Sequence, residues 1–209
     1  MKSKKIYLIR HGQTDFNLQG IVQGSGVDSS LNANGLKQAA LFYEKHKDYP
    51  FDKIYISNLK RTYESVGQFI EKGLPFEKNA ALNEISWGEY DGKLDTKDEK
   101  SIYWTIVDAW KNGDLKAKVE GAENPEEVRE RLLPFVQQLL DSQEENLLVC
   151  MHGRAMRVLL SVLTAQPLES MDSFLHSNLC LYVLEVRAGE VVILRENDTS
   201  HLEREHSRG

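Results

Sequence analysis

Cysteine is scarce in this sequence, and its scarcity excludes two classes of small protein. The 209 residues include only two cysteines, Cys150 and Cys180, and both lie within apolar runs. Two thiols cannot supply the disulfide framework of a small secreted domain or a cysteine-rich zinc site. Their apolar surroundings are typical of buried free thiols, and a single bridge between them is the alternative.

Long apolar runs and a basic charge balance are also missing. No stretch is long enough to cross a bilayer, and the basic residues 1–5 lead into an apolar run too short for a secretory signal. With 26 Lys and Arg against 32 Asp and Glu, the net charge is −6, which disfavours a broad nucleic-acid surface. We therefore expect a cytoplasmic protein that binds neither membranes nor nucleic acid. A small phosphorylated substrate is still compatible with this balance, because a local arginine cluster can bind it.

Sequence patterns for metal and nucleotide binding are missing as well. The histidines have no cysteine or carboxylate partner at ligand spacing, and no segment carries a paired-histidine helix motif. The glycine-containing loop at residues 12–32 lacks the Gly-Lys-Ser/Thr ending of a phosphate-binding P-loop. We therefore expect neither a metal site nor a cofactor.

What the sequence does contain is an alternation of short apolar runs with helical patterns. Short bounded apolar runs are typical of buried strands, and apolar residues three or four apart are typical of helices. We expect strands near residues 6–9, 54–56, 147–151, 179–186 and 191–194, and helices near residues 34–47, 59–70, 94–118, 125–141 and 155–163. This order predicts an α/β fold, a three-layer α/β/α sandwich with a mostly parallel central sheet. The length suits one domain, residues 1–209, with residues 88–122 as a small helical cap insertion.

Chemically reactive side chains stand where several of these strands end. The first strand closes with Arg10 and His11, and the strongest later apolar run closes with His152. Because ligands of open α/β sheets bind beyond the carboxyl ends of the strands, both imidazoles should meet in one crevice. Arg61 follows another predicted strand and should reach the same rim. Guanidinium groups bind phosphate oxygens and an imidazole can act as a nucleophile, so the pattern predicts a phosphate site with a reactive histidine.

The motifs around these residues resemble the histidine phosphatase superfamily, which is also called phosphoglycerate mutase-like. The run Leu-Ile-Arg-His-Gly-Gln-Thr at residues 8–14 is highly specific to that family, and the resemblance extends over residues 6–153. The further matching motifs, in the family's order, are Asn17, Gln23-Gly24, Ser57-Asn58-Leu59-Lys60-Arg61-Thr62, Leu82-Asn83-Glu84, Trp87-Gly88-Glu89-Tyr90-Asp91-Gly92 and Val149-Cys150-Met151-His152-Gly153.

The resemblance implies a role for each of these motif residues. His11 would attack phosphorus and become a phosphohistidine, and Glu84 would protonate the leaving oxygen and later accept a proton from water. Arg10, Arg61 and His152 would complete the catalytic set by binding the phosphate oxygens. The full substrate-binding set would be Arg10, Asn17, Gln23, Gly24, Arg61, His152 and Gly153.

The expected activity is metal-independent hydrolysis of a phosphomonoester on a small phosphorylated metabolite, as in histidine acid phosphatase-type enzymes. The pair Gln13-Thr14 resembles the phosphatase branches rather than the Glu-Ser pair that is usual in mutases. A short cap admits water, which favours hydrolysis over phosphoryl transfer. A cofactor-dependent phosphoglycerate mutase is the alternative enzyme, and a catalytically silent phosphate-binding module is the alternative from another class.

We assign structural roles to the remaining histidines, to two tryptophans and to residues that begin or interrupt helices. We expect His176 to be structural near the crevice and His46 to be structural or exposed, and we expect His201 and His206, in a polar tail, to be solvated. Trp104 and Trp110 are expected to pack within the cap or to line an apolar part of the pocket. Three further expectations are a helix cap at Ser57, a helix cap at Asn124 where the family often has serine, and a kink or a split of the helix at Pro134.

Overall fold

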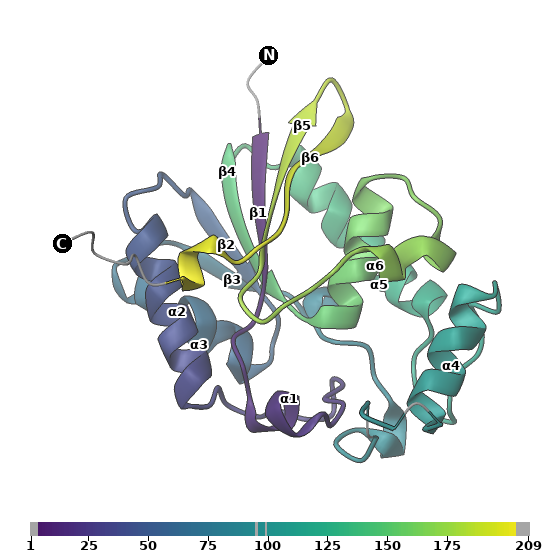
Figure 1. The fold of residues 1–209 in the computed structure, drawn as a ribbon. Helices are drawn as coiled ribbons and strands as arrows, with labels where there is room; N and C mark the ends of the chain where they lie inside the picture. Colours follow the sequence, from purple (N-terminus) through teal and green to yellow (C-terminus); the bar gives the residue numbers. More distant parts are fainter. Residues whose placement is uncertain (1–3, 95, 99, 204–209) are drawn as a thin grey trace.

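The fold is built on one six-stranded sheet, within a computed structural model that describes residues 4–94, 96–98 and 100–203 (Figure 1). The strands lie in the order β3-β2-β4-β1-β5-β6. Their bounds are β1 (Lys4–Arg10), β2 (Lys53–Ile56), β3 (Phe76–Lys78), β4 (Asn146–Met151), β5 (Leu181–Arg187) and β6 (Glu190–Asp198). β3, β2, β4 and β1 pair in parallel, whereas β5 pairs antiparallel with both β1 and β6. The expected mostly parallel sheet is confirmed.

Alternating side chains of the central strand β1 explain why both faces of this sheet are covered. Ile6 and Leu8 point into one hydrophobic core, and Tyr7 and Ile9 point into another, as the two-residue period of a strand requires. A strand that is apolar on both faces is stable only between two further layers. The α/β/α sandwich therefore follows from the apolar composition of β1.

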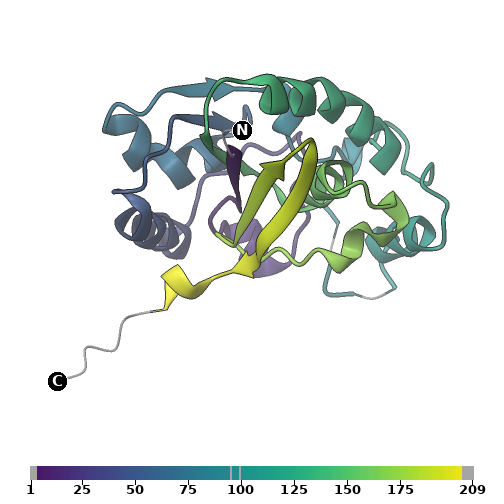
Figure 2. The ribbon, with the colours of Figure 1, turned by 90° about the horizontal axis from the view of Figure 1, so that it is seen from above.

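Four helices supply the two outer layers (Figure 2). Phe42 of α2 (Ala33–His46) and Phe69 of α3 (Lys60–Glu71) pack in the core with Ile9. Phe135 of α5 (Pro125–Asp141) and Leu159 of α6 (Gly153–Leu163) pack in the core with Leu8. Each layer thus seals one face of the sheet and leaves the carboxyl edge of its strands open for a site.

The register of the sheet sets where the reactive residues emerge. Arg10 pairs with Met151 at the end of the parallel β1–β4 ladder. His11 and His152 therefore leave adjacent strands side by side at the same edge. The next strand pairing, between Ile56 of β2 and Cys150 of β4, brings the segment after β2 to that edge as well.

The segment expected as a cap contains one regular helix, α4 (Ile102–Lys111), which lies apart from the sheet in Figure 1. Its apolar residues Val107 and Trp110 are buried in the same core as α5 and α6. The segment therefore packs against the α5–α6 side of the molecule rather than standing free. Positions 95 and 99 of this segment lie outside the described residues.

Several local expectations were wrong, each for an identifiable reason. The loop at 12–32 contains a short helix, α1 (Asp15–Gln19), because Thr14 and Asn17 form a reciprocal capping box. The strand β3 was missed because it is a three-residue edge strand. Pro134 does not split α5, which runs unbroken from its Pro125 start to Asp141.

Helix capping and burial correct two further expectations. Ser57 is not the cap of α3, because the residue directly before the helix is Leu59. The Ser57 hydroxyl accepts the Leu59 N–H and also bonds to the side chains of Thr62 and His152. His201 is not solvated but 6% exposed, and its ring packs against Phe42 and His46.

The remaining local expectations concern a helix cap, a histidine of the tail and the two thiols. Asn124 does cap α5 through a capping box with Glu127. His206 lies outside the described residues. Cys150 and Cys180 are buried free thiols, as expected.

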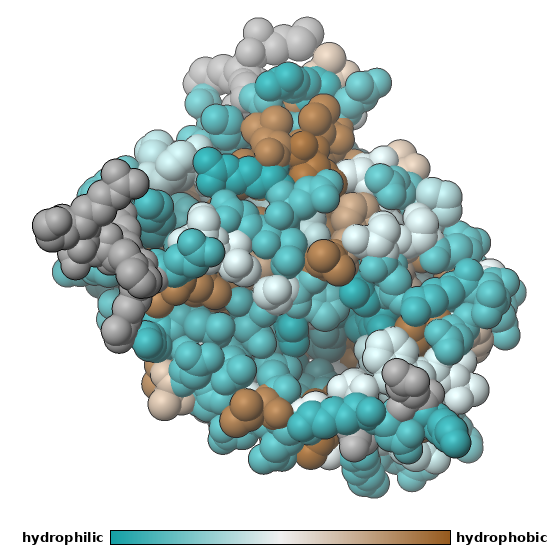
Figure 3. All heavy atoms as spheres, in the orientation of Figure 1, coloured by the Kyte–Doolittle hydropathy of each residue, from teal (hydrophilic) through white to brown (hydrophobic). Residues whose placement is uncertain are grey.

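The molecular surface seen in Figure 3 is mostly hydrophilic around the hollow below the sheet. A separate hydrophobic patch lies toward the top of that view, in the region of β5 and β6, where Val192 and Leu194 are exposed. Within the described part of the chain, none of the helices has both the length and the apolar character that a membrane span requires.

Candidate active site

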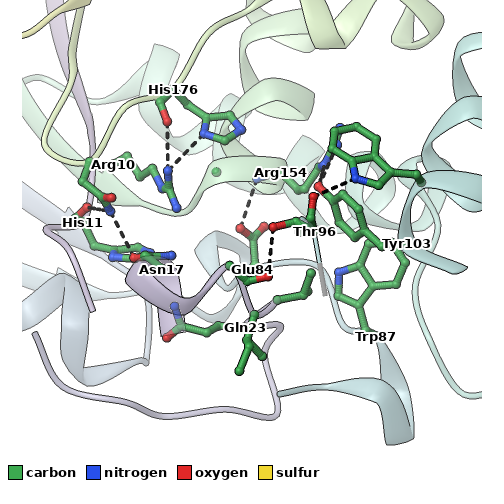
Figure 4. A pocket seen from close by; sticks show the side chains of 16 residues that line it. Arg10, His11, Asn17, Gln23, Glu84, Trp87, Thr96, Tyr103, Arg154 and His176 are labelled. Atoms are coloured by element: carbon green, nitrogen blue, oxygen red, sulfur yellow. Dashed lines mark hydrogen bonds between the residues drawn. The ribbon is translucent and has the colours of Figure 1, made fainter. Parts of the chain in front are cut away.

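A cavity of about 280 Å³ opens at the carboxyl edge of the sheet, where β1 and β4 end (Figure 4). Six of its lining residues belong to the set expected from the sequence: Arg10, His11, Asn17, Gln23, Glu84 and Gly153. The other lining residues are Gly20, Ile21, Val22, Trp87, Thr96, Tyr103, Trp104, Arg154, His176 and Asn178. Gly24, Arg61 and His152 do not line it. The structure thus brings most of the predicted residues to one cavity and leaves three of them behind its wall.

His11 presents one free ring nitrogen in this cavity. Its Nδ1 lies 2.7 Å from the carbonyl oxygen of Gly12, which can only accept a hydrogen bond, so Nδ1 carries the ring proton. Burial, followed by the positive charges of Arg61 and Arg10, lowers the pKa of His11 well below its usual range. The ring is therefore neutral at pH 7, with its lone pair on Nε2, which is the form that a nucleophilic histidine needs.

The backbone around His11 is held by contacts with three other parts of the chain. The His11 N–H donates to the Met151 carbonyl at 3.0 Å, and the Gly12 N–H donates to Ser65 Oγ at 2.9 Å. A Cβ atom at Gly12 would lie 2.8 Å from the Gly35 carbonyl oxygen, so glycine is required here. These contacts fix the turn that follows β1 and leave little room for the imidazole to move.

Arg61 and His152 form a buried pair directly behind His11. The rings of His11 and His152 have centroids 5.1 Å apart, so the two imidazoles lie side by side as expected, although only His11 lines the cavity. Arg61 Nε donates to His152 Nδ1 at 3.1 Å, which places the His152 ring proton on Nε2, 2.8 Å from Ser57 Oγ. Burial and Arg61 lower the pKa of His152 well below its usual range. Both nitrogens of this neutral ring are therefore engaged by the protein.

Arg61 is engaged on its other nitrogens too. Its Nη1 donates to the Val27 carbonyl at 2.6 Å, and its Nη2 lies 3.5 Å from the carbonyls of Gln23 and Gly24. Its side chain is completely buried. In this structure Arg61 thus joins the loop after α1 to the histidine pair, and its charge acts on the cavity through His11.

Arg10 has hydrogen-bond donors that no described residue accepts. Its Nη1 donates to the carbonyl oxygen of His176 at 2.9 Å and to the ring Nδ1 of His176 at 3.2 Å. Its Nε and Nη2 have no acceptor among the described residues. Burial, Arg10 and Arg157 together lower the pKa of His176 well below its usual range, so this ring is also neutral. A guanidinium group with unoccupied donors beside a neutral imidazole is suited to hold a phosphate.

Asn17 and Asn178 form the wall next to His11. Asn178 Nδ2 donates to the His11 carbonyl and to Asn17 Oδ1, both at 3.1 Å. Asn17 Oδ1 also accepts the Thr14 N–H, which fixes the amide so that its Nδ2 has no acceptor among the described residues. This amide nitrogen is a further donor available to an anion in the cavity.

Gln23 and Gly24 are fixed by the loop that follows α1. The Gln23 amide donates to Thr14 Oγ1 at 2.5 Å and accepts from the Ser29 hydroxyl. A Cβ atom at Gly24 would lie 1.8 Å from the Asp91 carboxylate, which also accepts N–H groups from Gly26 and Trp87. The close approach of Asp91 explains why position 24 is glycine.

Glu84 lies at the N-terminus of α6. Its Oε1 accepts the N–H groups of Ile85 at 3.0 Å and Ala155 at 2.8 Å, and its Oε2 accepts the Arg154 N–H at 3.0 Å. A helix N-terminus presents free N–H groups and a positive dipole end, so the carboxyl group is held in one place. Glu89, the other acid of this segment, is exposed and does not line the cavity.

The sequence patterns did not assign three lining residues to the site, Tyr103, Arg154 and Asn178, whereas His176 was expected near the crevice. Arg154 directly follows the His152-Gly153 motif, so its place at the edge of the site could have been anticipated from the chain order. His176 reaches the cavity because it packs on Gly153, where a Cβ atom would lie 3.0 Å from its ring. The described residues contain no cluster of three His, Cys, Asp or Glu side chains that could hold a metal ion.

Comparisons with known proteins agree with this arrangement. Residues 6–199 match the model of the histidine phosphatase superfamily (branch 1). The chain is 29% identical to phosphoserine phosphatase 1 of Hydrogenobacter thermophilus, over 95% of this chain and 94% of that protein. It is 33% identical to a 2,3-bisphosphoglycerate-dependent phosphoglycerate mutase of Bradyrhizobium diazoefficiens, over 78% of this chain and 82% of that protein.

A solved structure shares the whole fold. The α-ribazole phosphatase of Shigella flexneri superposes with a TM-score of 0.81 at 24% identity, covering 93% of this chain and 96% of that one. The family match spans nearly all of the sheet and every motif that surrounds the cavity. The chain therefore belongs to branch 1 of the histidine phosphatase superfamily.

Proposed function

We propose that this chain is a phosphohistidine-type phosphatase that hydrolyses a monoester of a small phosphorylated metabolite, with His11 as the nucleophile. The observation that carries the proposal is the unprotonated Nε2 of a neutral His11 in a cavity that also holds Arg10 and Glu84. The phosphatases among its relatives support hydrolysis as the outcome of that chemistry.

The proposed reaction has two steps in which bonds and protons balance. In the first, the Nε2 lone pair of His11 forms a bond to phosphorus, the ester P–O bond breaks, and protonated Glu84 gives its proton to the leaving oxygen. In the second, Glu84 takes a proton from water, the water oxygen bonds to phosphorus, and the P–N bond breaks. His11 then recovers its lone pair and Glu84 its proton, so one general acid-base group serves both steps.

The cations and amides around His11 take supporting roles in this scheme. Arg10 and Asn17 have free donors at the cavity and would hold the equatorial phosphate oxygens. Direct phosphate contacts from Gly24, Arg61 and His152 stay predictions, since these residues lie behind the cavity wall. We propose that Arg61 and His152 act chiefly by keeping His11 neutral and in place.

The role of the cap and the cellular setting are also proposals. We propose that residues 88–122 cover the leaving group within a single domain, because Thr96, Tyr103 and Trp104 of this segment line the cavity. A cytoplasmic location and the lack of a nucleic-acid partner stay predictions from the sequence.

Mutase activity is the second candidate, because a relative at 33% identity is named a phosphoglycerate mutase. Both activities pass through the same phosphohistidine and differ in whether water reaches it. Incubation with 3-phosphoglycerate and 2,3-bisphosphoglycerate separates them. Release of inorganic phosphate without 2-phosphoglycerate is expected, and rapid formation of 2-phosphoglycerate would assign the chain to the mutases.

The nucleophile is tested by trapping the intermediate. The wild-type protein should take up labelled phosphate from a phosphate monoester in an acid-labile, base-stable linkage on His11. The His11→Ala variant should take up none, and the matched control His46→Gln should behave as the wild type because His46 lies outside the cavity. Undiminished labelling and turnover in His11→Ala would refute the proposal.

A further inference from the structure

The cavity has a second end that the phosphate chemistry does not use. In Figure 4, Tyr103 and Arg154 lie on the opposite side of Glu84 from His11. If phosphate occupies the His11 end and Glu84 protonates the ester oxygen, the leaving group must extend toward Tyr103 and Arg154. The side chains at this end therefore determine which leaving groups bind.

Arg154 carries unused hydrogen-bond donors at this end of the cavity. Its Nε and Nη2 donate to the Tyr103 hydroxyl at 3.0 and 2.8 Å, and its Nη1 donates to Asp172. A guanidinium group has five N–H donors, and these bonds occupy three. The other two have no acceptor among the described residues, although the residue is only 7% exposed. Buried charged donors without acceptors next to a cavity indicate a site for an acceptor from outside.

The Tyr103 hydroxyl also has a donor proton without an acceptor among the described residues. Because an arginine can only donate, the phenol oxygen accepts both of the Arg154 hydrogen bonds and keeps its own proton to give. No described residue accepts that proton. Tyr103 is 8% exposed and belongs to α4, so the cap side of the cavity also offers a donor.

The charged side chains around Arg154 carry a net positive charge. The Asp172 carboxylate faces Arg154, Arg157 and, at 3.7 Å, Lys111. Lys111 also pairs with Asp108 at 3.6 Å, so two carboxylates face three positive charges, and one positive charge is in excess beside the far end of the cavity. Arg154 stays cationic there, because Asp172 and Tyr103 together raise its pKa despite its burial.

From these observations we propose that Arg154 and Tyr103 bind a second anionic group, a carboxylate or a phosphate, on the leaving group of the substrate. The proposal rests on the proposed phosphatase activity and names the substrate class of that site. The cavity volume of about 280 Å³ restricts the substrate to a small metabolite, since pockets for drug-sized ligands are generally larger. Arg154 is then a specificity-determining residue, and its guanidinium group can hold a carboxylate or phosphate through paired hydrogen bonds.

Two matched substrate pairs test this specificity on the wild-type protein. 3-Phosphoglycerate differs from glycerol 3-phosphate in a carboxylate, and O-phosphoserine differs from O-phosphoethanolamine in a carboxylate. A third pair, propane-1,3-diol bisphosphate and its monophosphate, replaces the carboxylate by a phosphate and so separates the two anions. We expect kcat/KM to favour the member with the second anion by about 10- to 100-fold in at least one pair. Equal kcat/KM within every pair would overturn the proposal.

An Arg154→Gln variant tests the residue itself. It keeps the backbone N–H that holds Glu84, so the preference within a pair is the informative readout rather than the absolute rate. The preference should fall by about 10- to 100-fold, mainly through KM for the doubly anionic member. Arg129→Gln is the matched control, because Arg129 is a partly exposed arginine that pairs with Glu130 and does not line the cavity, and its preference should match the wild type. A preference that survives in Arg154→Gln would overturn the proposal.

A second variant tests the proposal independently if Arg154→Gln does not fold. Tyr103→Phe removes only the phenol oxygen and should lower the same preference by about 3- to 30-fold. An unchanged preference in Tyr103→Phe would overturn the assignment of the pair. The phosphatase proposal fails separately, since in that case the wild-type protein would hydrolyse neither member of any pair.

Discussion

Replacing Glu84 with glutamine would keep the size of the side chain and remove the proton that the proposed mechanism gives to the leaving oxygen. General acid catalysis contributes about 100- to 10,000-fold in typical enzymes. For an alkyl phosphate, whose alkoxide is a poor leaving group, we expect kcat/KM of Glu84→Gln to fall by about 100- to 1,000-fold. For p-nitrophenyl phosphate, whose phenolate leaves without a proton, we expect a loss in kcat/KM below about tenfold, while kcat falls on both substrates because Glu84 also takes the proton of the attacking water.

The same substitution has a structural cost that can be worked from the hydrogen bonds. Both carboxylate oxygens accept backbone N–H groups, and one of them must become an amide NH2. If that group takes the place of Oε2, the Arg154 N–H loses its acceptor, at a cost of about 1–3 kcal/mol in the free energy of unfolding. A chain of this length would then melt roughly 2–12 °C lower.

Steady-state kinetics with the two leaving groups, and a thermal melt, test both parts. Glu89→Gln is the matched control, since Glu89 is exposed and outside the cavity, and it should keep wild-type kcat on both substrates. The mechanism would be refuted if Glu84→Gln lost the same factor in kcat/KM on both substrates, or if Glu89→Gln showed the leaving-group dependence instead.

Three further predictions follow from the geometry. Burial lowers the pKa of His201 to about 4, so the unfolded chain binds more protons below pH 6.5 and stability falls as the pH drops from 6.5 toward 4. After solvent screening this amounts to about 1–2 kcal/mol, and a His201→Phe variant should show a shallower loss of stability in acid urea titrations; an identical slope would contradict the assignment. Gly153→Ala places a Cβ atom 3.0 Å from the His176 ring, so the ring and its contact with Arg10 must shift, and KM for phosphate monoesters should rise several-fold while the fold, checked by circular dichroism, persists. Activity should be unchanged in excess EDTA, and a loss restored by a divalent cation would count against the metal-independent mechanism.

The central strands and the longest helices could be predicted from the sequence because their signals are local. The apolar run before His152 and the start of α5 at Pro125, after the Asn124 cap, are encoded within a few residues. The edge strand β3 and the helix α1 are short, so tertiary pairing and one capping box decide them instead. His201 was misjudged because its polar neighbours in sequence say nothing of Phe42, which packs on it.

The catalytic candidates could also be predicted from local sequence motifs. The residues proposed to determine specificity, Arg154 and Tyr103, could not. His11, Arg10 and Glu84 belong to ordered motifs whose strand ends the sheet register brings together. Arg154 and Tyr103 become meaningful only as a pair, and the pair forms through contacts between α6 and α4 that no short-range pattern encodes. That Arg61 and His152 sit behind the cavity also depends on side-chain packing, since a strand-end position alone places them only near it.

The proposed mechanism depends most on a single atom, the unprotonated Nε2 of His11, which must meet phosphorus while Arg10 holds the phosphate oxygens. A crystal structure of the complex with vanadate, a mimic of the pentacoordinate phosphorus of phosphoryl transfer, tests this directly. The mechanism predicts that vanadium is bonded to His11 Nε2, that Arg10 and Asn17 donate hydrogen bonds to the equatorial oxygens, and that the apical oxygen faces Glu84. Vanadium bonded to His152 or His176, or bound away from these imidazoles, would contradict it.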